Sequence, residues 1–138
     1  MSDASDPPSL DPHGIRPPDT YAIEVREPSE GVLVLGLEGE FDLAAAPALH
    51  DQLDAARRAA VRGVVLDFTD VTFVDSSGLR ELLRASSAFR ADGTALVLAA
   101  LQPAVTRLLE LTRATDALTV APTVEDALEH RLKRPGRT

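Results

Sequence analysis

The sequence predicts a single α/β domain with a mixed, mostly parallel β-sheet, an N-terminal antiparallel hairpin and about four helices. Two strand-like segments come first and are separated only by a short turn, which is typical of an antiparallel pair. Helix-like and strand-like segments then alternate to the end of the chain, and this order predicts parallel strands joined by right-handed crossovers. The later strand segments are almost continuously apolar, as expected for strands covered on both faces.

The hairpin is predicted from the first part of this pattern. Residues 21–26 alternate apolar with smaller or polar side chains, which is the period of a half-buried strand. Residues 27–31 read Glu-Pro-Ser-Glu-Gly and are typical of a turn. Residues 32–37 follow as a more apolar and therefore more buried strand.

A first helix is predicted from about Pro47 to Val61. Proline suits the first position of a helix, because the amide hydrogen that it lacks would have no partner there. The side chains that form one apolar stripe at helical spacing are Leu49, Leu53, Ala56 and Ala60. Gly63 is expected to end this helix.

The remaining elements follow in alternation. Residues 64–68 predict a central strand buried on both faces, and the apolar character continues over residues 70–74. The further elements expected are a helix over 77–91 stopped at Asp92-Gly93, a strand over 95–99, a helix from Pro103, a strand over 118–120 and a last helix opened by 122–126. In that last helix Thr123 is the expected N-cap and Asp126 its capping-box partner.

The folded domain is expected to cover residues 21–132. Residues 1–20 contain five prolines among aspartates and serines, and such a segment buries too little apolar surface to offset its ordering entropy. We therefore predict a disordered tail there, and a short basic tail over residues 133–138.

Composition narrows the possible functions. The net charge of −8 disfavours binding to nucleic acid or to a membrane, because both are anionic. The chain has no cysteine, which excludes disulfides and thiolate metal sites and fits a cytoplasmic location. No cofactor is expected. His13, His50 and His130 lack the spacing of metal ligands and are interpreted as solvated surface residues.

The most informative segment is the turn Asp75-Ser76-Ser77-Gly78, between a buried strand and a helix. Ser76 is thereby placed where a helix presents unpaired N–H groups and about half a positive charge, which stabilise anions. A phosphate on Ser76 would be held there and would add about −1.5 to −2 charge beside Asp75. Taken alone, the turn also fits a plain helix cap that needs no modification.

Three blocks of sequence resemble the STAS domain family (sulfate transporter and anti-sigma factor antagonist), and within it the bacterial anti-sigma factor antagonists. The blocks are residues 37–42 (LEGEFD), residues 65–79, which end in FVDSSGL, and residues 98–109 (LAALQPAVTRLL). They stand in the family's order and spacing, and the resemblance covers about residues 21–132. One departure lies in the loop after the third helix, where family members often carry glycine and this chain has residues 111–116, LTRATD.

The resemblance implies a binding protein without enzymatic activity, controlled by phosphorylation. It implies that an anti-sigma factor with serine kinase activity phosphorylates Ser76 and that a serine phosphatase removes the phosphate. The unphosphorylated form binds the anti-sigma factor and frees the sigma factor, and the phosphorylated form does not bind. The positions implied at the partner surface are Asp42, Asp75, Ser77, Gly78 and Leu79. We also expect Ser77 to cap and shape the start of the helix.

Other interpretations stay open at this point. A constitutive STAS scaffold or a transporter-accessory protein would keep the fold without a serine switch. The aspartates 42, 67, 70 and 75 could form a metal or phosphoaspartate site, but a receiver-type domain requires a lysine at a later strand end, and the only lysine is Lys133. Hydrolase and P-loop motifs are absent. Arg80, Arg84 and Arg90 are interpreted as a solvated helix face rather than as partner contacts.

Overall fold

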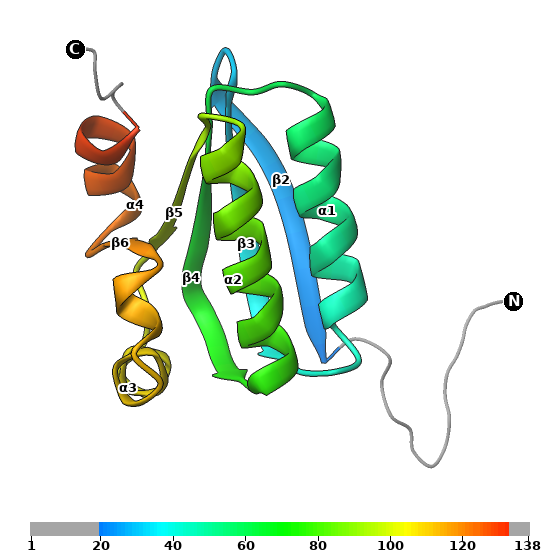
Figure 1. Cartoon of the computed structure of the whole chain (residues 1–138), viewed down its shortest axis with the longest axis vertical. Helices are drawn as coiled ribbons and strands as arrows, with labels where there is room; N and C mark the ends of the chain where they lie inside the picture. Colours follow the sequence, from blue (N-terminus) through cyan, green and yellow to red (C-terminus); the bar gives the residue numbers. More distant parts are fainter. Residues whose placement is uncertain (1–19, 133–138) are drawn as a thin grey trace, which may run out of the picture.

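The sheet and its order confirm the predicted fold class. The computed structural model describes residues 20–132, so the predicted tails, Thr20 apart, lie outside the described residues. Five strands lie in the order β2-β3-β4-β5-β6 (Figure 1). Their bounds are Tyr21–Ser29, Val32–Phe41, Gly63–Val74, Ala95–Ala99 and Thr119–Ala121. β2 pairs antiparallel with β3, and the other three neighbouring pairs are parallel.

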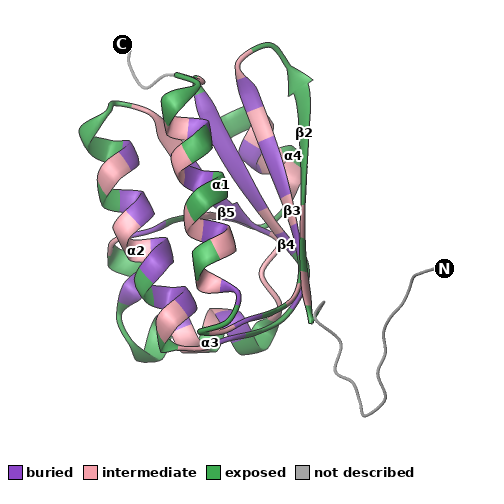
Figure 2. Cartoon of the chain, turned by 90° about the vertical axis from the view of Figure 1, so that its right-hand side faces the viewer, coloured by how far each residue is buried: buried purple, intermediate pink, exposed green. Residues whose placement is uncertain are grey.

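Helices cover both faces of this sheet. α1 (Ala46–Arg58) and α2 (Ser76–Ala91) lie side by side over one face (Figure 1). The third helix, α3 (Pro103–Leu111), is followed by a 3-10 turn, η2 (Ala114–Asp116). The chain then forms a single helical turn, α4 (Val124–Asp126), which continues as the π-helix η3 (Ala127–Arg131) on the opposite face of the sheet (Figure 2).

Two apolar clusters fill the space between the sheet and its helices. Because successive side chains of a strand point to opposite faces, neighbouring residues of β3, β4 and β5 enter different clusters. Leu35, Leu66 and Leu98 face α1 and α2, and belong to the larger cluster. The smaller cluster joins the sheet to α4 and η3, and its buried members are Val32, Val34, Val65, Val97, Ala99, Ala121, Ala127 and Leu132.

The prediction for the end of the first helix was wrong. The helix ends at Arg58, and Ala60 is exposed with a φ of 58°, so Ala60 lies beyond the apolar stripe. Gly63 is instead the buried first residue of β4. A Cβ added at Gly63 would lie 2.8 Å from Leu132 Cδ2, so the glycine makes room for the C-terminal helix. Ala60 closes α1 with the left-handed backbone that the sequence analysis assigned to a glycine.

The end of the fold agrees better with the sequence. Thr123 Oγ1 accepts a hydrogen bond from the Asp126 N–H at 2.9 Å, which confirms the predicted N-cap. In the loop after α3, Arg113 has a φ of 63°. This is the left-handed conformation that a glycine adopts without strain. The loop thus lacks the glycine that family members often carry, and Arg113 adopts the glycine-like backbone instead.

Candidate functional site

The carboxyl ends of β3 and β4 lie side by side. Phe41 pairs with Val74 as the last residue of each strand, and the Asp75 N–H donates to the Phe41 carbonyl at 3.2 Å. Because β3 and β4 are parallel neighbours, Asp42 and Asp75 follow at the same edge of the sheet. The structure therefore brings together two residues that are 33 positions apart in the sequence.

Asp75 caps α2. Its Oδ1 accepts hydrogen bonds from the Ser77 N–H at 2.8 Å and from the Gly78 N–H at 3.1 Å, and its own backbone is extended. The expectation that Ser77 caps the helix is therefore wrong. Ser77 lies inside the first turn, where its N–H is a donor to the cap, and the carboxylate of Asp75 is the stronger partner for a positive helix end.

Gly78 allows α2 to approach the end of β3. A Cβ at this position would lie 2.3 Å from the Phe41 carbonyl oxygen and 3.1 Å from Val74 Cγ1. No side chain fits, because the nearest atom belongs to the backbone. Leu79 is buried beside it and anchors the first turn of α2 in the larger core. Gly78 and Leu79 thus set where the turn sits, and neither offers a partner much accessible surface.

Asp42 shapes the loop between β3 and α1. Its Oδ1 accepts from the Ala44 N–H at 3.0 Å and from the Ala45 N–H at 3.2 Å. Both candidate aspartates are therefore engaged with backbone amides that start the next helix. Asp67, in β4, accepts from the Thr69 hydroxyl at 2.6 Å. Within residues 20–132 no group of three acidic, histidine or cysteine side chains is arranged to hold a metal ion.

Ser76 is the exposed first residue of α2. It directly follows Asp75, whose carboxylate already accepts from the next two N–H groups. A phosphate on Ser76 would add a second anion at this helix end and compete with the cap. The exposed cation Arg80 lies four positions further along α2, on the same side of the helix.

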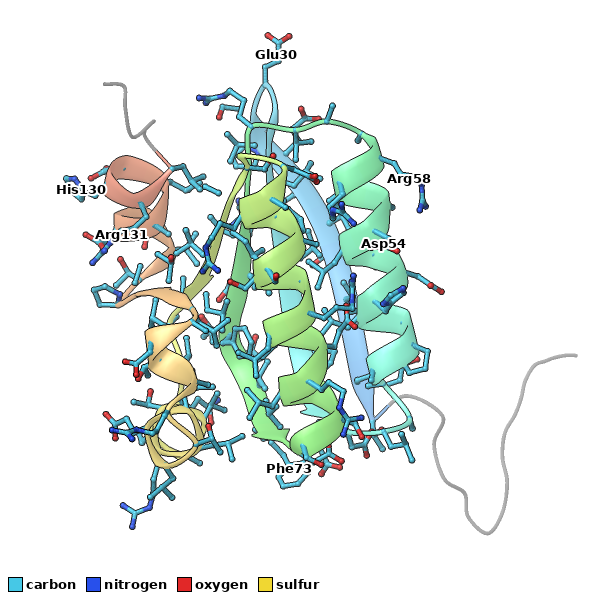
Figure 3. All side chains as sticks on the ribbon, viewed as in Figure 1. Glu30, Asp54, Arg58, Phe73, His130 and Arg131 are labelled. Atoms are coloured by element: carbon cyan, nitrogen blue, oxygen red, sulfur yellow. The ribbon has the colours of Figure 1, made fainter. Side chains whose placement is uncertain are left out.

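Two large apolar side chains that were not singled out from the sequence are exposed within two positions of Asp42 and Asp75 along the chain. Leu43, in the loop after Asp42, is 72% exposed, and Phe73, near the end of β4, is 48% exposed. Figure 3 shows Phe73 at the end of the molecule where α2 begins. Large exposed apolar side chains beside a polar turn are typical of a protein-binding surface. Only the fold reveals their exposure, because in the sequence both belong to segments typical of an apolar strand or a loop.

A pocket of about 350 Å³ opens between the first turns of α1 and α2. Its lining residues are Leu43, Ala46, Pro47, His50, Ser77, Arg80, Glu81 and Arg84. The pocket continues the exposed surface of the turn onto both helices. Ser77 lines its wall.

A polar network ties α1 to α2 beneath this pocket. Glu81 is buried, and its carboxylate accepts from Arg84 Nη2 at 2.6 Å and lies 3.1 Å from His50 Nδ1. His50 Nε2 lies 3.2 Å from Asp54 Oδ2 (Figure 3 labels Asp54). The hydrogen bond to Glu81 raises the pKa of the Arg84 guanidinium. His50 and Arg84 are at the surface, as interpreted from the sequence, with side chains 41% and 34% exposed. Each also contacts the other helix, since Arg84 Nη2 donates to Asp54 Oδ1 at 3.4 Å.

The other residues considered in the sequence analysis do not join this site. Arg90 donates to the Ala117 carbonyl at 3.2 Å, at the far end of α2. His130 is exposed on the C-terminal helix (Figure 3). No helix among the described residues has both the length and the apolar character needed to cross a membrane.

The sequence and the fold both match known proteins. The STAS domain family model matches residues 23–127. The chain is 30% identical over 101 residues to the anti-sigma-B factor antagonist of Listeria monocytogenes, which covers 72% of this chain and 87% of that protein. It is 35% identical over 77 residues to solute carrier family 26 member 10 of Mus musculus, but this covers only 11% of the carrier.

Solved structures show the same relation. An anti-sigma factor antagonist from Mycobacterium paratuberculosis superposes with a TM-score of 0.73 at 30% identity, covering 83% of this chain and 96% of that one. The antagonist SpoIIAA in its unphosphorylated form shares the fold with a TM-score of 0.68 at 22% identity, covering 80% of this chain and 96% of its own. The chain thus belongs to the STAS domain family, among the anti-sigma factor antagonists.

Proposed function

We propose that this protein binds an anti-sigma factor with serine kinase activity, and that phosphorylation of Ser76 by that partner ends the binding. In the unphosphorylated state the bound anti-sigma factor releases its sigma factor. A serine phosphatase restores the binding form. The protein itself performs no chemistry in this cycle, since it supplies a hydroxyl group and a surface.

The position of Ser76 is the observation that carries the proposal. It is exposed at the start of α2, with a carboxylate cap on one side and exposed Leu43 and Phe73 nearby. A kinase can reach the hydroxyl from solvent, and a partner that covers the apolar side chains would also cover Ser76. A phosphate adds about −1.5 to −2 charge and would have to be desolvated in that interface.

A scaffold or transporter-accessory role is the alternative. Mouse solute carrier family 26 member 10 carries a matching segment that makes up a small part of its length, whereas the antagonists match over most of theirs. The match over most of the antagonist's length supports the switch over the accessory role.

The first test is the site of phosphorylation. We expect incubation with a serine-kinase anti-sigma factor from the same cell and ATP to add one phosphate, located on Ser76 by tandem mass spectrometry. Ser76→Ala should abolish the modification, whereas Ser77→Ala should retain it. A phosphate on another residue, or none, would contradict the proposal.

The second test is binding. We expect Ser76→Asp to weaken the complex with the anti-sigma factor by about 1–2 kcal/mol or more, measured by calorimetry, because it places a second carboxylate beside Asp75 at the interface. Ser87→Asp makes the same chemical change at an exposed position further along α2 and should leave affinity unchanged. Equal affinities for wild type and Ser76→Asp would show that the turn does not control binding.

A further inference from the structure

The edge of the sheet opposite the Asp75 turn is rich in arginine. Arg62 directly precedes β4, Arg90 lies in the last turn of α2, and Arg131 ends η3. The next residues in the sequence, 133–138, add one lysine and two arginines. Among the described residues, Arg62, Arg90 and Arg131 thus lie at one edge of a protein whose net charge is −8.

Three of these arginines line one pocket. The pocket has a volume of about 250 Å³, and its lining residues are Arg62, Arg90, Gly93, Thr94, Ala95, Arg131 and Leu132. A neighbouring pocket of about 450 Å³ shares Arg62 and Leu132 with it. Nothing lies within 4 Å of the position that a Cβ on Gly93 would occupy, so the glycine leaves this part of the pocket open.

The charges of the three arginines are poorly neutralised. Arg90 donates to the Ala117 carbonyl, and Arg131 Nε lies 3.7 Å from Asp126 Oδ2, beyond a good hydrogen bond. Arg62 forms no ion pair with any residue between 20 and 132. By contrast, Arg57 meets a carboxylate at 2.8 Å. Arg62 and Arg90 have no carboxylate partner among residues 20–132 and Arg131 is held only at 3.7 Å, so the pocket keeps a positive potential that a bound anion would relieve.

Helix ends explain part of this arrangement. Arginines in the last turn of a helix stabilise its negative end, which accounts for Arg90 and Arg131 on their own helices. Arg62 belongs to no helix, and it completes the pocket from the loop before β4. The presence of all three arginines in the lining of one pocket is therefore not required by the helices.

We propose that this pocket binds an anion of the phosphate class. The planar guanidinium group presents paired N–H donors that match phosphate oxygens, and three such groups can surround one phosphate or diphosphate. The Thr94 hydroxyl adds a further donor at the wall of the pocket. The site lies at the opposite edge of the sheet from Ser76, so it can be occupied while the turn faces a partner.

The test is a titration of the full chain with inorganic pyrophosphate, followed by amide chemical shifts. We expect saturable shifts centred on Gly93, Thr94 and Leu132, weakened by added salt. Arg62→Gln should raise the dissociation constant for pyrophosphate by about fivefold, because an exposed ion pair contributes at most about that factor to binding. Arg62→Lys should restore part of the affinity, which separates charge from folding.

Arg58→Gln is the matched control. Arg58 is exposed and does not line the pocket, and Figure 3 shows it on the opposite side of the molecule from Arg131. If Arg58→Gln and Arg62→Gln weaken pyrophosphate binding equally, the weakening comes from the loss of overall positive charge, and the pocket is not a specific site. Shifts scattered over the surface, or no saturable shifts at all, overturn the proposal in the same way.

Vesicle sedimentation tells whether the anion is a free phosphate compound or the headgroup of a lipid. Pyrophosphate binding that depends on Arg62, without pelleting on phosphatidylglycerol vesicles, assigns the pocket to a free phosphate compound. Pelleting on these vesicles but not on phosphatidylcholine, again lost in Arg62→Gln and kept in Arg58→Gln, assigns it to a lipid headgroup.

Discussion

At the scale of single residues, the turn is fixed by one carboxylate and one missing side chain. Asp75 holds the first N–H groups of α2, and Gly78 lets the helix rest against the last carbonyl of β3. Ser76 lies between them with its side chain in solvent. The exposed hydroxyl is therefore held by a rigid frame, so a modification there changes the surface without requiring the core to move.

Gly78→Ala should destabilise the fold strongly. The added Cβ would lie 2.3 Å from the Phe41 carbonyl oxygen, and relief requires a backbone shift, so we expect a loss of about 3 kcal/mol or more in the free energy of unfolding. Urea denaturation measures it. Gly93→Ala is the control, because its φ of 73° brings strain of about 1 kcal/mol but no clash. Similar losses in both variants would contradict the close approach of α2 to β3.

At the scale of elements, α1 and α2 are held together at both ends by polar contacts. Nearer the turn, Glu81 of α2 contacts His50 of α1, and Arg84 Nη2 of α2 donates to Asp54 Oδ1 of α1 at 3.4 Å. At the other end Arg57 Nε donates to Asp92 Oδ2 at 2.8 Å, joining the last turn of α1 to the residue that ends α2. The two helices that carry the candidate partner surface thus keep a fixed relative position.

The Arg57–Asp92 contact predicts a pH dependence. The hydrogen bond from Arg57 holds the pKa of the Asp92 carboxyl below its usual value. Because the folded-state pKa lies below the unfolded value of about 3.9, the stabilisation is complete above that pH and is lost as the pH falls through the folded-state pKa.

Calorimetry should therefore show a lower melting temperature for Asp92→Asn than for wild type at pH 6, and a gap that closes toward pH 3. The contact is exposed, so the gap should be small. In an Arg57→Gln background, Asp92→Asn should produce no such pH-dependent gap. A gap of constant size between pH 6 and pH 3 would show that Asp92 acts through packing rather than charge.

At the scale of the whole molecule, the sheet separates two apolar clusters, one on each face, and holds the two proposed sites at opposite edges. One face carries α1 and α2, and the other is closed by α4 and η3, whose last contact is Leu132 against Gly63 (Figure 2). The edge with the Asp75 turn carries the proposed switch, and the opposite edge carries the arginine pocket. The two proposed sites therefore share one rigid sheet without sharing residues.

Leu132→Ala should test how much the second face contributes. Leu132 is 6% exposed in the smaller cluster, and we expect its truncation to cost about 2–3 kcal/mol of unfolding free energy. Leu111→Ala removes the same atoms from a side chain that is 72% exposed, and its cost should stay within about 0.5 kcal/mol. Equal costs in urea denaturation would mean that the C-terminal helix does not close the core.

The sequence by itself determined the order of the strands and helices and the position of Ser76 at the start of α2. These follow from local information, since apolar periodicity and turn residues are read within a few positions. The apolar runs of β4 and β5 also gave their burial on both faces, because no other arrangement hides a continuous apolar strand.

Only the tertiary structure decided how distant residues meet. It placed Asp42 beside Asp75, showed that Asp75 and not Ser77 caps α2, and set Gly63 against Leu132. It also exposed Leu43 and Phe73, buried Glu81 beside His50, and gathered three arginines in one pocket. Apart from the cap of α2, these depend on contacts between segments far apart in the chain, and periodicity along the sequence carries no record of such pairings. The cap is local, but both Asp75 and Ser77 are residue types that can cap a helix, so the sequence alone did not decide between them.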